Sequence, residues 1–145
     1  MLGEQNKTIE YIEYQRESLV KKIGFATTNK VFAQSLAASV EKNPALGFVL
    51  YLMLNPNQAV IDAKALGIDV AVVDVISGIT DADQILSFCR KLRQSVPGCR
   101  LMLLVSQNDK AGCELAIKAT KNSNADDYIF YDASLQYLFA KLSAF

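Results

Sequence analysis

Five short apolar runs, separated by amphipathic stretches, constrain the fold of this chain more than any other feature of its sequence. The runs lie at residues 22–26, 48–54, 70–75, 101–105 and 127–131. They are nearly continuous in apolar residues, which is typical of strands covered by helices on both faces. Between the runs apolar residues recur at helical spacing, as in the stripe formed by Ile85, Phe88, Cys89, Leu92 and Val96. The alternation predicts an open, doubly wound α/β domain around a parallel sheet, because right-handed crossovers place helices on both faces.

Proline and glycine mark the ends of the predicted elements. Pro56 follows Asn55 and falls in the first turn of the second predicted helix, where a missing N–H is tolerated. Gly67 comes just after that helix and suits a left-handed cap. Asn43-Pro44 and Pro97-Gly98 mark two further boundaries, because proline does not continue a helix.

The composition excludes several classes of function. A length of 145 residues, 51% of them hydrophobic, predicts one domain that is stable without disulfides or metal. The 15 basic residues balance the 15 acidic ones, which argues against a nucleic-acid binder or a polybasic membrane anchor. The longest apolar run, residues 48–54, is far shorter than the ~20 residues of a membrane-spanning helix. Because the sequence contains no histidine, it excludes Ser–His and Cys–His nucleophile pairs and most kinds of zinc site. We expect neither an enzyme active site nor a bound metal.

The cysteines and the N-terminus predict a soluble cytoplasmic domain. Cys89, Cys99 and Cys113 are odd in number and lack CxxC spacing, so they do not form a disulfide framework. The first residues contain no apolar stretch of a secretory signal. Residues 1–20 stand outside the strand–helix pattern and are expected to be a loosely docked leader or an extra helix that contacts a partner. The domain itself is expected at residues 21–145.

Polar residues follow the predicted strands at the edge where parallel sheets of this kind bind ligands. Thr27 and Thr28 follow the first strand, Asp74 lies near the end of the third, and Ser106 follows the fourth. Tyr131 ends the fifth run. Taken alone, Asp74 fits equally a functional carboxylate and a hydrogen-bond acceptor for a loop or helix end. Ser106 taken alone is an ordinary hydroxyl at a strand end.

Together these residues resemble the response-regulator receiver domain. Asp74 falls at the phosphoacceptor position of that family, and Asp81 at the late acidic residue of its aspartate loop. Ser106 matches the hydroxyl residue that contacts the phosphoryl group, and residues 125–128 (Ala-Asp-Asp-Tyr) resemble the approach to strand five, with Tyr128 at the aromatic switch position. The resemblance implies a three-layer α/β/α, flavodoxin-like (βα)5 fold whose five parallel strands have the order 2-1-3-4-5.

The chain departs from the family at the charged positions. Receivers place an acidic pair after strand one to hold Mg²⁺, whereas this chain has Thr27 and Thr28. Receivers end strand five in Lys-Pro, whereas Tyr131 and Asp132 stand here. Phosphoryl transfer needs cations to offset the charge of the phosphoryl group, and Mg²⁺ needs carboxylates. With Lys30 as the only nearby basic candidate, the sequence predicts a pseudo-receiver that signals by protein–protein interaction without phosphorylation.

Two alternatives stay open. The first is a genuine phosphoacceptor that uses Asp74 and Ser106 with atypical metal ligands, for which Asp81 or Asp109 is available. The second is a binder of flavin or another phosphate-bearing cofactor, since residues 27–29 (Thr-Thr-Asn) precede a helix N-terminus that suits phosphate. The sequence contains neither GxGxxG nor GxxxxGK[ST], and the first expectation is a domain without a cofactor.

The aromatic residues near the C-terminus suggest where a partner binds. The resemblance implies that the face formed by helix four, strand five and helix five mediates dimers and output contacts. Tyr128, Tyr131 and Tyr137 belong to this region, and tyrosine is favoured at interfaces because it adds area at little rotamer cost. Phe139 is expected in the core. We expect a protein partner or a homodimer on this face.

Overall fold

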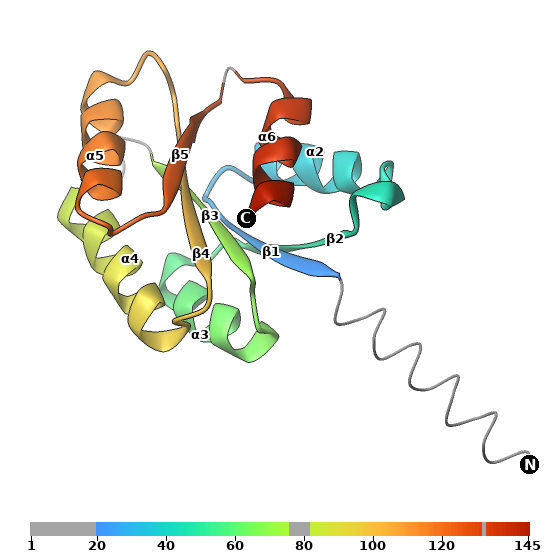
Figure 1. The fold of residues 1–145 in the computed structure, drawn as a ribbon, viewed down its shortest axis with the longest axis horizontal. Helices are drawn as coiled ribbons and strands as arrows, with labels where there is room; N and C mark the ends of the chain where they lie inside the picture. Colours follow the sequence, from blue (N-terminus) through green and yellow to red (C-terminus); the bar gives the residue numbers. More distant parts are fainter. Residues whose placement is uncertain (1–19, 76–81, 132) are drawn as a thin grey trace, which may run out of the picture.

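A computed structural model describes residues 20–75, 82–131 and 133–145, which form an α/β domain with a central parallel sheet (Figure 1). The strands are β1 (Lys21–Ala26), β2 (Phe48–Met53), β3 (Val70–Val75), β4 (Arg100–Val105) and β5 (Asp127–Phe130). The helices are α2 (Lys30–Glu41), α3 (Pro56–Leu66), α4 (Ala82–Ser95), α5 (Lys110–Lys121) and α6 (Leu135–Ala144), with a short 3-10 helix η1 (Pro44–Leu46). All strand pairs are parallel, and the strand order β2-β1-β3-β4-β5 confirms the predicted fold class and topology.

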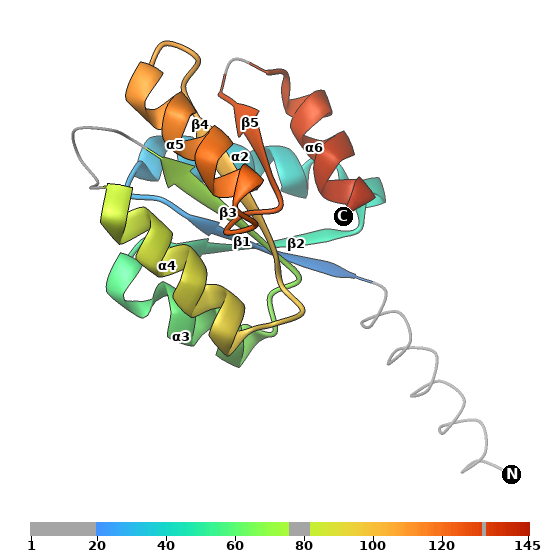
Figure 2. The same cartoon turned by 60° about the vertical axis from the view of Figure 1, so that its left-hand side comes forward.

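The helices cover both faces of the sheet and produce three layers. Helices α3, α4 and α5 lie on one face, and α2 and α6 lie on the other (Figures 1 and 2). The two middle strands are therefore covered on both sides: every residue of β3, and all of β4 except Arg100, is buried. This explains why these runs are continuously apolar in the sequence rather than alternating.

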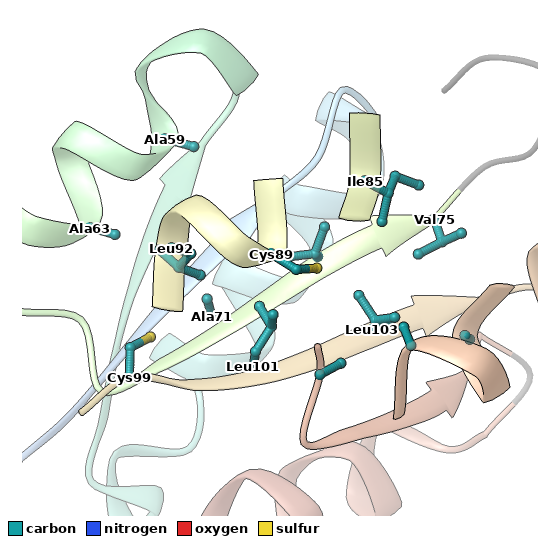
Figure 3. Close-up of a cluster of buried hydrophobic side chains, with 14 of the residues drawn as sticks. Ala59, Ala63, Ala71, Val75, Ile85, Cys89, Leu92, Cys99, Leu101 and Leu103 are labelled. Carbon is teal, nitrogen blue, oxygen red and sulfur yellow. The ribbon is translucent and has the colours of Figure 1, made fainter. Parts of the chain in front are cut away.

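Each face of the sheet has its own apolar core. The core under α3, α4 and α5 includes the predicted stripe residues Ile85, Cys89 and Leu92 (Figure 3). The core under α2 and α6 includes Phe25 and Phe139, so the predicted burial of Phe139 is confirmed. Burial raises the pKa of the Cys89 thiol to about 11, which keeps this cysteine protonated and unreactive at neutral pH.

The helix ends follow the turn residues of the sequence. Asn55 caps α3 by accepting a hydrogen bond from the Asn57 N–H (3.0 Å), and Pro56 occupies the first turn as predicted. Gly67 ends α3 in the left-handed conformation, with φ of 68°. Asp109 caps α5 through the Gly112 N–H (3.0 Å), and a Cβ at Gly112 would lie 2.5 Å from Asp109 Oδ2. A glycine at position 112 therefore lets the α5 N-terminus pack against its own cap.

The predicted leader, residues 1–20, lies outside the described residues except for Val20, so its role stays a prediction. Within the ranges that the structure describes, no helix is both long and apolar enough to cross a membrane.

Candidate functional site

The candidate site lies at the carboxyl edge of the sheet, between β1 and β3. The chain runs from β1 outward to β2 and then crosses to β3 on the other side of β1, so the strand order reverses here. In open α/β sheets, ligands bind in the crevice at this reversal. Asp74 is the fifth residue of β3, and Thr27 directly follows β1. The fold thus brings together two residues that are 47 positions apart in the sequence.

Asp74 is buried, with 9% of its surface exposed, and each of its carboxylate oxygens accepts a hydrogen bond. The Thr27 hydroxyl donates to Asp74 Oδ2 at 2.7 Å, and the Tyr131 hydroxyl donates to Asp74 Oδ1. Thr27 is itself held in place, because its Oγ1 accepts the Asn29 N–H at 2.9 Å. Buried carboxylates are costly unless they are hydrogen-bonded, and the two hydroxyl groups satisfy this one.

Tyr131 follows β5 and reaches across β4 to Asp74. Its backbone N–H still donates to the Val105 carbonyl at 3.0 Å, which fixes its position beside the sheet although β5 ends one residue earlier. Its ring packs edge-on against Phe32 of α2, with the ring centroids 5.0 Å apart. Burial, the hydrogen bond to Asp74 and the negative charge of that carboxylate raise the pKa of the Tyr131 phenol, so it remains a neutral donor.

Ser106 and Asp109 have other partners. Ser106 Oγ accepts the Asn108 N–H at 3.3 Å, and the Ser106 carbonyl accepts the Asp109 N–H at 3.0 Å. Among the described residues, the hydrogen bonds of Ser106 lie within its own loop and the start of α5, and none joins it to Asp74. Asp109 serves as the N-cap of α5. The roles expected for Ser106 and Asp109 in phosphate or metal binding stay predictions.

A cleft of about 680 Å³ opens beside Asp74 and extends towards α3 and α4. Its polar lining comes from the β1 edge and from both helices: Thr27, Thr28, Asn57, Asp74, Asp83, Gln84, Ser87 and Lys91. The α4 residues were not assigned to the site from sequence. Their spacing carried a signal, because Gln84, Ser87 and Lys91 share one helical face at intervals of three and four.

The remaining predicted positions lie on or near β5 and α6, or outside the described residues. Asp81 and Asp132 lie outside the described residues. Tyr137 is 51% exposed on α6, and Tyr128 packs edge-on against Phe130 on β5, with ring centroids 5.9 Å apart. Tyr131 is half-buried and binds Asp74 instead of projecting outward.

Two acidic residues of the receiver-like approach to strand five form ion pairs. Asp126 lies 3.1 Å from Arg93 and 3.5 Å from Arg100, and it accepts the Leu101 N–H at 2.8 Å. Asp127 pairs with Lys141 at 2.5 Å. These contacts tie α4, β4, β5 and α6 together. Across the described parts of the chain, no three acidic or cysteine residues are grouped so as to hold a metal ion.

No family model matches the sequence, and no curated protein matches it. Solved structures of response regulators do share its fold. One from Thermotoga maritima is 23% identical, with a TM-score of 0.68 over 87% of this chain and 97% of that chain. Another, a two-component response regulator from Clostridium difficile, is 23% identical, with a TM-score of 0.66 over 86% of this chain and 93% of its own.

A third, from Burkholderia pseudomallei, was solved with a phosphorylated aspartic acid, a calcium ion and citrate. It is 25% identical, with a TM-score of 0.63 over 84% of this chain and 66% of its own. The chain therefore has the fold of response-regulator receiver domains.

Proposed function

We propose that this chain is a receiver-type signal-transduction domain that acts through protein–protein contact without phosphorylation of Asp74. One observation carries the proposal: both carboxylate oxygens of Asp74 are held by neutral hydroxyl groups, those of Thr27 and Tyr131. These hydroxyls stand where the receiver family is expected to place an acidic residue and a lysine. The resemblance implies that the position of the acceptor is kept while the groups around it have changed.

The chemistry of phosphoryl transfer supports this interpretation. The acceptor carboxylate must attack with an oxygen lone pair, and the negative charge on the transferred group must be offset by cations. Here Thr27 and Tyr131 supply hydrogen bonds but no charge. A Mg²⁺ site of the receiver type needs one or two carboxylates around the phosphate. The acidic pair of such a site is replaced after β1 by the neutral Thr27 and Thr28, and among the described residues no three acidic or cysteine side chains are grouped so as to hold a metal ion.

The face formed by α5, β5 and α6 is the proposed partner surface, and its chemistry suits a protein. Tyr137 is exposed on α6, and the Lys141 ammonium lies 5.7 Å from the centre of its ring. Lys141 also pairs with Asp127 of β5. Tyrosine is enriched at protein interfaces and their rims are polar, so an exposed tyrosine ring beside an ion pair is compatible with such a surface.

A genuine phosphoacceptor is the second candidate, and the cleft is the observation that favours it. Asp74 lines this cleft together with Lys91, a cation that sequence analysis did not assign to the site. If the Thr27 and Tyr131 hydroxyls release the carboxylate, Lys91 becomes a source of positive charge on the same cleft.

Beryllofluoride, which mimics an aspartyl-phosphate, separates the two candidates. We expect the two-dimensional amide NMR spectrum of the chain to be unchanged by Mg²⁺ and then beryllofluoride. Asp74→Asn serves as the matched control, because it keeps the shape of the side chain and removes the acceptor. Shifts at Thr27, Asp74 and Ser106 in the wild-type chain that are absent in D74N would establish the phosphoacceptor instead. An acid-labile adduct formed with acetyl phosphate would have the same meaning.

A further inference from the structure

A second cavity lies on the opposite face of the sheet, between α2 and α6. Its volume is about 210 Å³, and it is open to solvent on one side. Figure 2 shows the two helices side by side on this face. The floor is Leu104 of β4, which is only 2% exposed, so the cavity reaches down to the sheet. The walls are Phe32, Ser35, Leu36, Phe130, Tyr131, Ala133, Leu135 and Leu138.

The lining of this cavity matches a small aromatic molecule. Two of its residues, Phe32 and Tyr131, bring aromatic rings from the core on this face of the sheet, and aromatic rings pack favourably edge-to-face or offset. Ser35 brings a hydroxyl group to the wall. An apolar cavity of about 150 Å³ in another protein stays dry and binds benzene, so this volume accommodates one or two fused rings. We propose that the cavity binds a small aromatic molecule of the size of indole, with one hydrogen-bonding group towards Ser35.

Tyr131 connects this cavity to Asp74. Its ring forms part of the wall and contacts Phe32, while its hydroxyl donates to the Asp74 carboxylate. A ring bound in the cavity packs against the same face of the sheet that positions Tyr131. Because the Tyr131 ring lines the cavity, we expect occupancy to change the hydrogen bond at Asp74. This inference rests on the proposed function, and it gives the domain an input signal: binding of the aromatic ligand takes the place of phosphorylation.

An NMR titration of the full chain with indole tests the site. We expect saturable shifts of the amide signals of Phe32, Ser35 and Leu138, which surround the cavity, and further shifts at Thr27 and Asp74 through Tyr131. Shifts that grow linearly with indole up to its solubility limit, or that scatter over the surface, would overturn the proposal.

Two substitutions of alanine by leucine provide a matched pair. Ala133→Leu adds bulk to the cavity wall and is expected to abolish the saturable shifts. Ala38→Leu adds the same bulk at an exposed position of α2 that does not line the cavity, and is expected to leave them unchanged. Equal binding by A133L and the wild-type chain would place the indole elsewhere.

Tyr131→Phe tests the connection itself. The variant keeps the ring in the wall and loses the hydroxyl that binds Asp74, so indole is expected to shift the cavity signals but no longer those of Thr27 and Asp74. Unchanged shifts at Asp74 in Y131F would show that Tyr131 does not transmit occupancy. The titration is independent of the beryllofluoride experiment: a beryllofluoride response with saturable indole binding would overturn the proposed function but not the ligand site.

Discussion

At the scale of single residues, the site is defined by what Asp74 binds. A carboxylate near the end of a buried strand needs hydrogen-bond donors, and the fold offers them from the ends of β1 and β5. Thr27 and Tyr131 meet this need without adding charge. The same geometry with charged neighbours would favour a metal ion and a phosphoryl group. Under the proposed function, a change of only a few side chains separates a phosphorylation site from a satisfied buried acid.

The phenol of Tyr131 is expected to respond to the charge of Asp74. Burial, the hydrogen bond and the nearby carboxylate raise the pKa of Tyr131, so the folded chain holds this proton more tightly than the unfolded chain. Its stabilising contribution is complete below the ordinary tyrosine pKa of about 10 and is lost as the pH rises through the folded value. Asp74→Asn removes the charge but not the burial, and is expected to lower the pKa of Tyr131.

Carbon NMR of labelled tyrosine, titrated from neutral pH to the alkaline limit of the folded state, measures this change. Tyr131→Phe identifies the signal. Identical titration of Tyr131 in the wild-type chain and in D74N would contradict the hydrogen bond to Asp74.

Three of the residues that the sequence placed at this edge, Thr27, Asp74 and Tyr131, are joined by hydrogen bonds, whereas Ser106 is bonded within its own loop and the start of α5. The positions of Thr27, Asp74 and Tyr131 follow from strand ends and topology, which the apolar pattern specifies. The hydroxyl of Tyr131 reaching over β4 depends on side-chain rotation and on packing against Phe32, and neither has a sequence signal. Lys91 was not assigned to the site from the sequence. Its place in the cleft depends on how α4 sits against β3, which spacing alone does not determine.

At the scale of elements, two neighbouring lysines of β1 hold helix ends on opposite faces of the sheet. The Lys21 ammonium donates to the carbonyls of Leu142 (2.8 Å), Ser143 (3.1 Å) and Phe145 (2.5 Å), at the end of α6. The Lys22 ammonium donates to the Leu66 carbonyl (3.1 Å), at the end of α3. Cations at helix C-termini are favourable because the last carbonyls lack partners within the helix.

Lys21→Met is expected to lower the free energy of unfolding by about 1–2 kcal/mol, because three carbonyls lose a charged donor while the apolar stem is kept. Lys22→Met is the matched control on the same strand. It removes one such bond and is expected to cost only about 0.5 kcal/mol. Urea unfolding at neutral pH measures both values. Equal losses would show that the α6 carbonyls gain nothing specific from Lys21.

Elements were predicted well where local chemistry determines them. The five strands, the Pro56 start of α3 and the Gly67 cap all appear as expected. The lysine contacts with distant helix ends were not predicted, because they join residues that are far apart in the sequence. Lys21 and Leu142, for example, are 121 positions apart. Such contacts exist only once the sheet has placed β1 beside the end of α6.

At the scale of the whole molecule, the fold and the side chains of the candidate site depend on different parts of the sequence. The fold matches response-regulator structures with TM-scores of 0.63–0.69 at identities of 16–25%. A parallel sheet with two apolar cores depends on the pattern of buried residues, and the residues at its carboxyl edge contribute little to that pattern. Function therefore resides in a small number of side chains placed on a fold that tolerates their exchange.

If this separation holds, three substitutions are expected to supply the missing chemistry. Thr27→Asp and Thr28→Asp introduce the acidic pair, and Tyr131→Lys introduces the cation while freeing one oxygen of Asp74. We expect the triple variant to gain Mg²⁺-dependent amide shifts with beryllofluoride, centred on Asp74, that the wild-type chain lacks. Tyr131→Phe alone frees the same oxygen without adding charge, and is expected to show no amide shifts with Mg²⁺ and beryllofluoride. A folded triple variant whose amide signals do not shift with beryllofluoride would show that features of the fold other than these three side chains prevent phosphorylation.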